Sequence, residues 1–157
     1  ESYTFHGRDV YAYTGARLAS GIINFTEVGP LRDTDSLVRL PIIEPRLDGH
    51  AVCGTIDVLD VRFGSLWTNI PRTLFLQTGI QYGDRVSITI ENDTRCVYRN
   101  IILFARSFAD VYVGEALAYV NSLDCVAVAI NQGSFARAYN IGTGNSWRIR
   151  IEPFKGF

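Results

Sequence analysis

From Gly49 to its end the sequence alternates apolar and polar residues with a period of two, and this constrains the fold more than any other feature. The runs are rich in Val, Ile, Thr, Tyr and Trp and are bounded by Gly, Asn and Asp, which favour turns. Many short strands separated by turns are typical of a sandwich or small barrel. We therefore predict a mostly β domain with strands at residues 52–59, 66–70, 85–91, 97–104, 116–120, 125–131 and 147–152, and a short helix at 135–139 capped by Ser134.

The residues before Gly49 have a different character. Residues 8–20 contain no proline, Asp9 falls in the first turn and Gly21 can cap the end, so this segment is predicted to be a helix. Residues 29–48 are polar and are interrupted by three prolines. That composition predicts a linker that leads from one domain to the next.

The composition is that of an ordinary soluble globular protein, with 47% hydrophobic and 20% charged residues in a chain of 157. A net charge of -1 gives no reason to expect a nucleic acid or an anionic membrane as a partner. The apolar runs are too short to span a bilayer, and no leader pattern is visible. The chain contains no methionine, so we expect it to be part of a longer protein.

The three cysteines, Cys53, Cys96 and Cys125, lie in apolar segments that are predicted to be strands. An odd number without metal-ligand spacing argues against both a disulfide framework and a zinc site. The pattern predicts reduced cysteines in the core of a cytoplasmic protein, with no metal.

Several polar and aromatic residues have both a structural and a functional interpretation. His6, at the entrance of the predicted helix, could serve in capping and packing or in catalysis. Asp60 ends a predicted strand and could hold either its own turn or a ligand. Phe63 and Trp67 are equally consistent with core aromatics, and Asn121 with a turn between two strands. The residues alone leave these alternatives open.

Taken together, four segments carry a resemblance to a known family. They are Thr4-Phe5-His6-Gly7-Arg8-Asp9, Asp60 to Ile70, Asn121-Ser122 and Ile130 to Ser134. In this order and spacing they resemble the S-adenosylmethionine (SAM) hydroxide adenosyltransferases, relatives of the fluorinase and chlorinase. The resemblance covers nearly the whole chain and corresponds to the C-terminal part of such an enzyme. It implies an antiparallel β-barrel domain at 49–157, a linker at 29–48, and at 1–28 the last piece of an α/β SAM-binding domain.

The resemblance also implies an activity. Members of the family convert SAM and water into adenosine and methionine, with SAM as the substrate and no cofactor. His6 would be the catalytic residue that orients the attacking water or hydroxide. The fluorinase has tyrosine at the position of His6 and serine at the position of Gly7, so this pair favours water over a halide. The family forms homotrimers with sites at subunit interfaces, and we expect the chain alone to be inactive.

The same resemblance implies a set of substrate-binding residues. Asp60 would accept hydrogen bonds from the ammonium group of the methionine portion, and Ser122 would bind its carboxylate. Trp67 would form the pocket wall beside the methionine portion. Ser65 departs from the asparagine that is usual in the family, and Asp124 is expected to point away from the carboxylate. The full set is Thr4, Phe5, Gly7, Asp60, Phe63, Ser65, Trp67, Phe108, Asn121, Ser122, Ile130, Asn131 and Gln132, of which Phe63, Phe108 and the backbone of residues 130–132 would contact adenine.

Two other functions stay open at this stage. The chain could be a non-catalytic module that binds SAM or a nucleoside, or one that serves oligomerisation, because Ser65, Leu123 and Asp124 depart from the family pattern. His6 argues against a pure binding module. A SAM-dependent halogenase is the third alternative, and His6 together with Gly7 argues against it.

Overall fold

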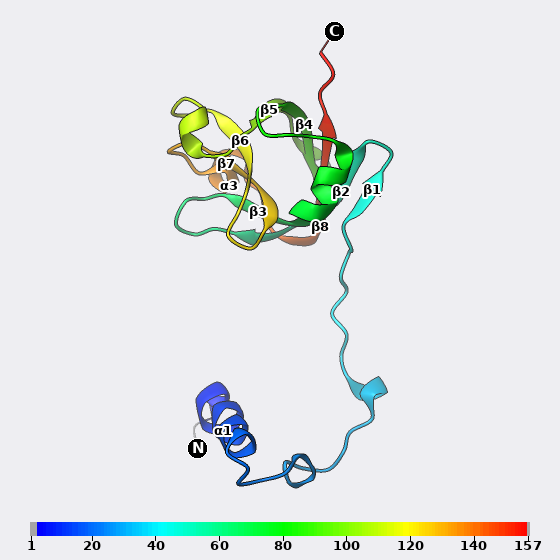
Figure 1. Cartoon of the computed structure of the whole chain (residues 1–157), viewed down its shortest axis with the longest axis vertical. Coiled ribbons are helices and arrows are strands. Elements are labelled where there is room, and N and C mark those ends of the chain that lie inside the picture. Colours follow the sequence, from blue (N-terminus) through cyan, green and yellow to red (C-terminus); the bar gives the residue numbers. More distant parts are fainter. Residues whose placement is uncertain (1–2, 157) are drawn as a thin grey trace. The chain divides into compact units, whose positions relative to one another are not determined.

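The structure is a computed structural model that describes residues 3–156. It comprises two compact units that divide between Leu40 and Pro41, and each is described by itself (Figure 1). Among the described residues, no helix is both long enough and apolar enough to cross a membrane.

The first unit contains the helix predicted at residues 8–20. A π-helical segment, η1 (Gly7–Ala12), runs directly into α1 (Tyr13–Ala19), and Gly21 follows with a φ of 71°. Two 3₁₀ turns, η2 (Phe25–Glu27) and η3 (Thr34–Ser36), come after it. Neither η1 nor α1 has a buried residue, so the unit lacks an apolar core of its own along this helix.

The second unit is the predicted β domain, and all seven predicted strands and the capped short helix are present. The sheet begins inside the segment predicted as a linker, and three short helical turns were not predicted. The strands are β1 (Arg46–Asp48), β2 (Ala51–Leu59), β3 (Leu66–Pro71), β4 (Arg85–Glu91), β5 (Cys96–Phe104), β6 (Ala116–Val120), β7 (Cys125–Ile130) and β8 (Gly144–Pro153), and the helical segments are α2 (Arg72–Phe75), η4 (Leu76–Thr78), η5 (Phe108–Asp110) and α3 (Phe135–Tyr139).

The strands form one 8-stranded sheet in the order β1-β2-β3-β7-β6-β5-β4-β8, and an additional pairing of β2 with β8 closes it into a barrel (Figure 1). Every neighbouring pair is antiparallel except β5 and β6, where Leu103 pairs in parallel with Leu117. The predicted antiparallel barrel is therefore correct but for this one pair. A parallel pair needs a long crossover, and residues 105–115 with η5 supply it.

The barrel interior is filled by the apolar positions of the alternating strands. Val86, Ile88 and Ile90 of β4 are fully buried. Ile149 and Ile151 of β8 are at most 1% exposed. Burial of each such side chain contributes roughly 1.5–3 kcal/mol, so the period-two pattern is also the main source of stability.

The cysteines are not core residues, so that prediction was wrong. All three are free thiols, and Cys53 and Cys125 are half-buried while Cys96 is exposed. Cys53 stands between Val52 and Gly54 of β2, whose faces alternate, and its side chain falls on the outer face.

A short strap, residues 41–45, enters the barrel and is held by two asparagines. Asn69 Nδ2 donates to the Ile43 carbonyl at 2.7 Å, and Asn69 Oδ1 accepts from the Thr55 amide at 2.8 Å. Asn145 Nδ2 donates to the Pro41 carbonyl at 2.6 Å. Gly54 leaves room for the Asn69 side chain, because a Cβ there would lie 2.4 Å from Asn69 Oδ1, which accepts from the Thr55 amide.

We expect Asn69→Ala to lower the free energy of unfolding by about 1–3 kcal/mol, because it leaves partly buried groups unpaired. Asn145→Ala removes an exposed strap contact and is the matched control, with an expected cost below about 1 kcal/mol. Urea denaturation followed by tryptophan fluorescence measures both. Equal losses in the two variants would contradict the anchoring role of Asn69.

Tyr98 is expected to make stability depend on alkaline pH. Its buried hydroxyl has no hydrogen-bond partner within residues 3–156, and burial raises the pKa of Tyr98 from 10.0 to about 12. Because the folded-state pKa is the higher one, the neutral form stabilises the fold below pH 10, and this contribution is lost as the pH rises from 10 to 12. Tyrosinate absorbance should show one late-titrating group in the wild type. That group should be missing in Tyr98→Phe.

Candidate functional site

The barrel carries a pocket of about 1190 Å³ on the outer face of β3, β7 and β6. Two segments wall it, the turn at residues 60–64 and the stretch at residues 130–137. The pocket brings together nearly all of the predicted binding residues of the barrel, namely Asp60, Phe63, Trp67, Phe108, Asn121, Ser122, Ile130, Asn131 and Gln132.

The strand register explains the pocket floor. Trp67 of β3 pairs with Ala127 of β7, and Ala127 pairs with Tyr119 of β6, so the three side chains share one face. Ala127 itself is fully buried between the two aromatic residues, and Trp67 and Tyr119 line the pocket. Phe108 packs on Tyr119 with ring centroids 5.2 Å apart and extends this wall.

Three consecutive residues of β3 serve three different parts of the barrel. Trp67 faces the pocket, whereas the next residue, Thr68, is buried. The Thr68 hydroxyl donates to the Val126 carbonyl at 2.7 Å and so ties β3 to β7. Asn69 then holds the strap. The position of Trp67 is therefore fixed by its immediate neighbours.

Asp60 holds its own turn, which is one of the two roles that the sequence left open for it, and it also lines the pocket. One carboxylate oxygen, Oδ1, accepts from the Arg62 amide at 2.9 Å and shapes the turn. The Asp60 amide and carbonyl bond to Ser65 and Gly64 at 2.9 and 2.7 Å. The second carboxylate oxygen has no protein partner among the described residues and lies in a pocket wall, where it can accept from a cationic ligand.

The two walls of the pocket are joined at Gly64. Its carbonyl accepts from the Ala136 amide at 3.1 Å, and a Cβ at Gly64 would lie 2.1 Å from Ser134 Oγ. Gly64 also has a φ of +68°, which favours glycine. This contact brings Arg137, next to Ala136, to the pocket edge.

The turn between β6 and β7 is built around Asn121. Its Oδ1 accepts from the amides of Leu123 and Cys125 at 2.9 and 3.1 Å, which leaves Ser122 at the pocket. Asp124 has a φ of 59°, and its carboxylate lies 3.0 Å from Arg72 Nε. Asp124 thus pairs with α2 outside the pocket wall, which is the orientation that we expected.

At the other end of β7, Asn131 holds a loop. Its Nδ2 donates to the Val111 carbonyl at 2.9 Å, and its backbone bonds to Gly114 and Glu115 at 2.8 and 2.9 Å. The Asn131 backbone is therefore engaged within the protein. Ile130, the residue before it, bridges to Gly133, whose amide donates to the Ile130 carbonyl at 3.1 Å. Gln132 follows in a left-handed conformation, with a φ of 57°.

Ser65 differs from the other predicted binding residues. It is fully buried beneath the turn and does not line the pocket, and its hydroxyl has no hydrogen-bond partner among the described residues. Besides Tyr98, two other buried donors lack a partner within residues 3–156, Trp67 Nε1 and Asn121 Nδ2, and both belong to residues that line the pocket.

The remaining predicted site residues, Thr4, Phe5, His6 and Gly7, lie in the first unit and are exposed. His6 stands at the N-terminal end of η1, and its side chain makes no capping hydrogen bond. The Arg8 guanidinium lies over the Phe5 ring at 4.9 Å. Within residues 3–156 no cluster of three or more His, Cys, Asp or Glu side chains is placed to hold a metal ion.

Sequence reasoning missed several residues that line the pocket, among them Arg62, Tyr119 and Arg137. Tyr119 could have been found, because its outward position follows from the alternation of β6. Arg137 gives no such signal. It reaches the pocket only through the contact between Gly64 and α3, which no local pattern encodes.

The fold defines the second unit as a closed β-barrel domain with a pocket on its outer face. Residues 54–148 match the family described as the SAM hydroxide adenosyltransferase C-terminal domain. The chain belongs to this family.

Relatives of known activity fall into two groups. The chain is 33% identical over 150 residues to a fluorinase of Nocardia brasiliensis, covering 94% of this chain and 48% of that protein. It is 32% identical over 159 residues to an (R)-S-adenosyl-L-methionine hydrolase of Salinispora tropica, covering 94% and 51%. The chain therefore spans about half the length of these curated relatives.

Solved structures agree with the fold. An uncharacterized conserved protein from Thermotoga maritima superposes with a TM-score of 0.74 at 29% identity, covering 96% of this chain and 53% of that one. A conserved hypothetical protein from Thermus thermophilus gives a TM-score of 0.59 at 26% identity, covering 95% and 52%.

Gly64→Ala should disrupt the joint between the two pocket walls. Gly79 also has a positive φ, of +82°, but a Cβ there meets nothing within 4 Å, so Gly79→Ala measures backbone strain alone. We expect Gly79→Ala to cost about 1–2 kcal/mol of stability. Gly64→Ala adds a clash with Ser134 and should cost about 1–3 kcal/mol more in the same denaturation experiment. Indistinguishable costs would show that the contact is not tight in solution.

Proposed function

We propose that this chain is the C-terminal part of a SAM hydrolase, a hydroxide adenosyltransferase that forms adenosine and methionine. Family membership and the (R)-S-adenosyl-L-methionine hydrolases among its relatives support the reaction class. The observation that carries the proposal is the pocket, which gathers Asp60, Trp67 and Ser122 from three separate segments into one wall.

The pocket chemistry suits the methionine end and the base of SAM. The free carboxylate oxygen of Asp60 can accept from the ammonium group, and Ser122 can donate to the carboxylate. Phe63 and Phe108 offer apolar faces for adenine. Since SAM is itself the substrate, the proposal includes no cofactor.

The reaction is a displacement at C5′ of SAM. Oxygen of water or hydroxide forms a bond to C5′ while the C5′–S bond breaks, and the electron pair of that bond neutralises the sulfonium as methionine leaves. The leaving group needs no proton, so the protein must orient the nucleophile and accept one proton from water. We assign this role to His6, with SAM held by the barrel residues.

We further propose that the complete protein is a homotrimer with active sites at subunit interfaces. The exposure of Thr4, Phe5, His6 and Gly7 is compatible with such a site. On this proposal the isolated 157-residue chain binds SAM weakly and does not turn it over.

Two other functions are each favoured by one observation. The buried Ser65, which does not line the pocket, favours a non-catalytic module that binds SAM or a nucleoside. The fluorinases among the relatives favour a halogenase, whereas His6 and Gly7 argue against it.

The test uses the complete protein, incubated with SAM and high chloride in heavy-oxygen water and analysed by mass spectrometry. We expect adenosine and methionine, with the label at the 5′-hydroxyl. A 5′-chloro nucleoside would place the protein with the halogenases. Bound but unchanged SAM would leave the binding module as the function.

In the same assay, His6→Ala should lower kcat by about 10²–10⁴-fold while SAM affinity stays within a few fold. Asp60→Asn is the complementary variant and should weaken SAM binding instead, by about tenfold or more. Retained turnover in His6→Ala would remove histidine from the mechanism.

A further inference from the structure

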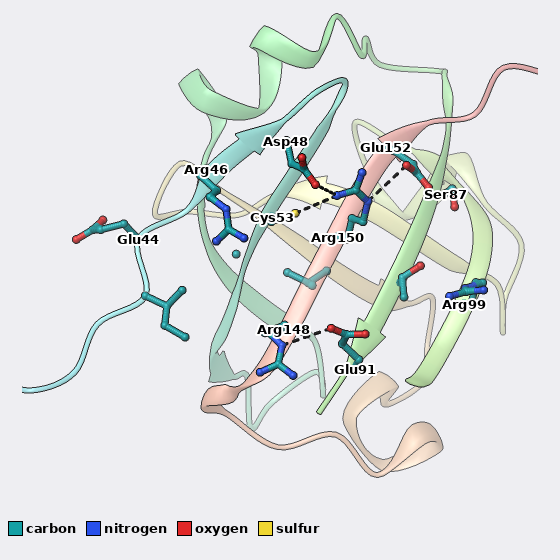
Figure 2. Close-up of a pocket in the computed structure, with 14 residues that line it drawn as sticks. Glu44, Arg46, Asp48, Cys53, Ser87, Glu91, Arg99, Arg148, Arg150 and Glu152 are labelled. Atoms are coloured by element: carbon teal, nitrogen blue, oxygen red, sulfur yellow. Dashed lines mark hydrogen bonds and ion pairs between the residues drawn. The ribbon is translucent and has the colours of Figure 1, made fainter. Parts of the chain in front are cut away.

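A second hollow, of about 570 Å³, lies on a different part of the barrel surface and shares no lining residue with the pocket described above. It runs over the outer face of β2, β8, β4 and β5, beside the strap and β1 (Figure 2). We call it the arginine groove, because Arg46, Arg99, Arg148 and Arg150 line it.

The strand register places three of these arginines in one row. Arg46 pairs with Cys53, Cys53 with Arg150, Arg150 with Thr89, and Thr89 with Arg99. Residues paired directly across antiparallel strands point to the same face, with Cβ atoms about 5 Å apart. Arg150 and Arg99 therefore flank Thr89 from both sides, as Figure 2 shows for the two arginines.

The carboxylates of the groove do not neutralise all of the arginines. Arg148 pairs with Glu91 and Asp93 at 3.4 and 2.8 Å. Arg150 pairs with Asp48 and, through Nε at 3.6 Å, with Glu152.

Arg99, by contrast, has no ion-pair partner among the described residues, and Arg150 Nη2 has no hydrogen-bond partner among them. Arg46 and Glu44, which also line the groove, likewise have no ion-pair partner among them, so the unpaired positive charge at the Thr89 end of the row is that of Arg99.

The floor between the two arginines is low and polar. Thr89 and Ser87 alternate outward on β4, and neither hydroxyl has a hydrogen-bond partner within residues 3–156. Short side chains between long ones account for the hollow. A ligand seated there meets two hydroxyl donors below and a guanidinium on each side.

We propose that the arginine groove binds a phosphate-type oxyanion, seated on Thr89 between Arg99 and Arg150. A planar guanidinium matches two oxygens of such an anion, and the hydroxyls complete its coordination. This site is independent of the proposed SAM chemistry, because none of its residues touches that pocket.

The test is a titration of the 157-residue chain with inorganic phosphate and, separately, with glycerol phosphate, at constant ionic strength set with chloride. Amide and arginine Nε chemical shifts report binding. We expect saturable shifts at β4, β5 and β8. Tighter binding of glycerol phosphate would identify an esterified phosphate as the natural ligand class, and tighter binding of inorganic phosphate would identify the free anion. Failure of both anions to saturate would overturn the proposal.

Arg99→Gln should weaken anion binding about tenfold or more. Arg99→Lys keeps the charge but loses the planar guanidinium that donates two parallel hydrogen bonds, so it should weaken binding less. Arg95→Gln is the matched control, because Arg95 is exposed in the β4–β5 turn of the same hairpin but lies outside the groove. It should change the affinity less than twofold. Equal losses in Arg95→Gln and Arg99→Gln would mean diffuse attraction rather than a site. Unchanged thermal unfolding confirms that the variants are folded.

Discussion

The closure of the barrel by β2 is the interaction on which the rest of this structure depends. β2 is nine residues long and pairs with β8 along one edge, while its other edge pairs first with β1 and then with β3. Both edges are engaged at Val52, Cys53 and Ile56, so the middle of the strand is held from two sides. Its end at Leu59 then leads into the turn at residues 60–64, so closure also fixes one wall of the pocket.

The alternation of the strands divides the barrel into an interior that stabilises and an exterior that can bind. On β4, Val86, Ile88 and Ile90 fill the core, while Ser87 and Thr89 face the arginine groove. On β3, Trp67 faces the pocket and Thr68 the core. Binding surfaces can therefore change on the outer face with little effect on the packed interior.

The period-two alternation of apolar and polar residues predicted the strands, and the turn and capping residues predicted their ends and the helix capped by Ser134, because these signals are local. They could not predict the parallel β5–β6 pair, since pairing partners depend on how a crossover returns to the sheet. The resemblance placed nine of the barrel's site residues in what proved to be one pocket, but not Ser65, whose burial depends on the turn above it. Arg137 was not predicted as a site residue because only a tertiary contact brings it to the pocket.

Asn69 also has a mechanical consequence. It grips the strap through Ile43 and the barrel through Thr55, and it sits two residues from the pocket residue Trp67 on the same strand. Tension on the chain that enters the barrel therefore meets the side chains of Asn145 and then Asn69 before it reaches the short strand β1. A shortened strap would pull on the strand that carries a pocket wall, whereas a lengthened one would simply bulge outward before the anchor.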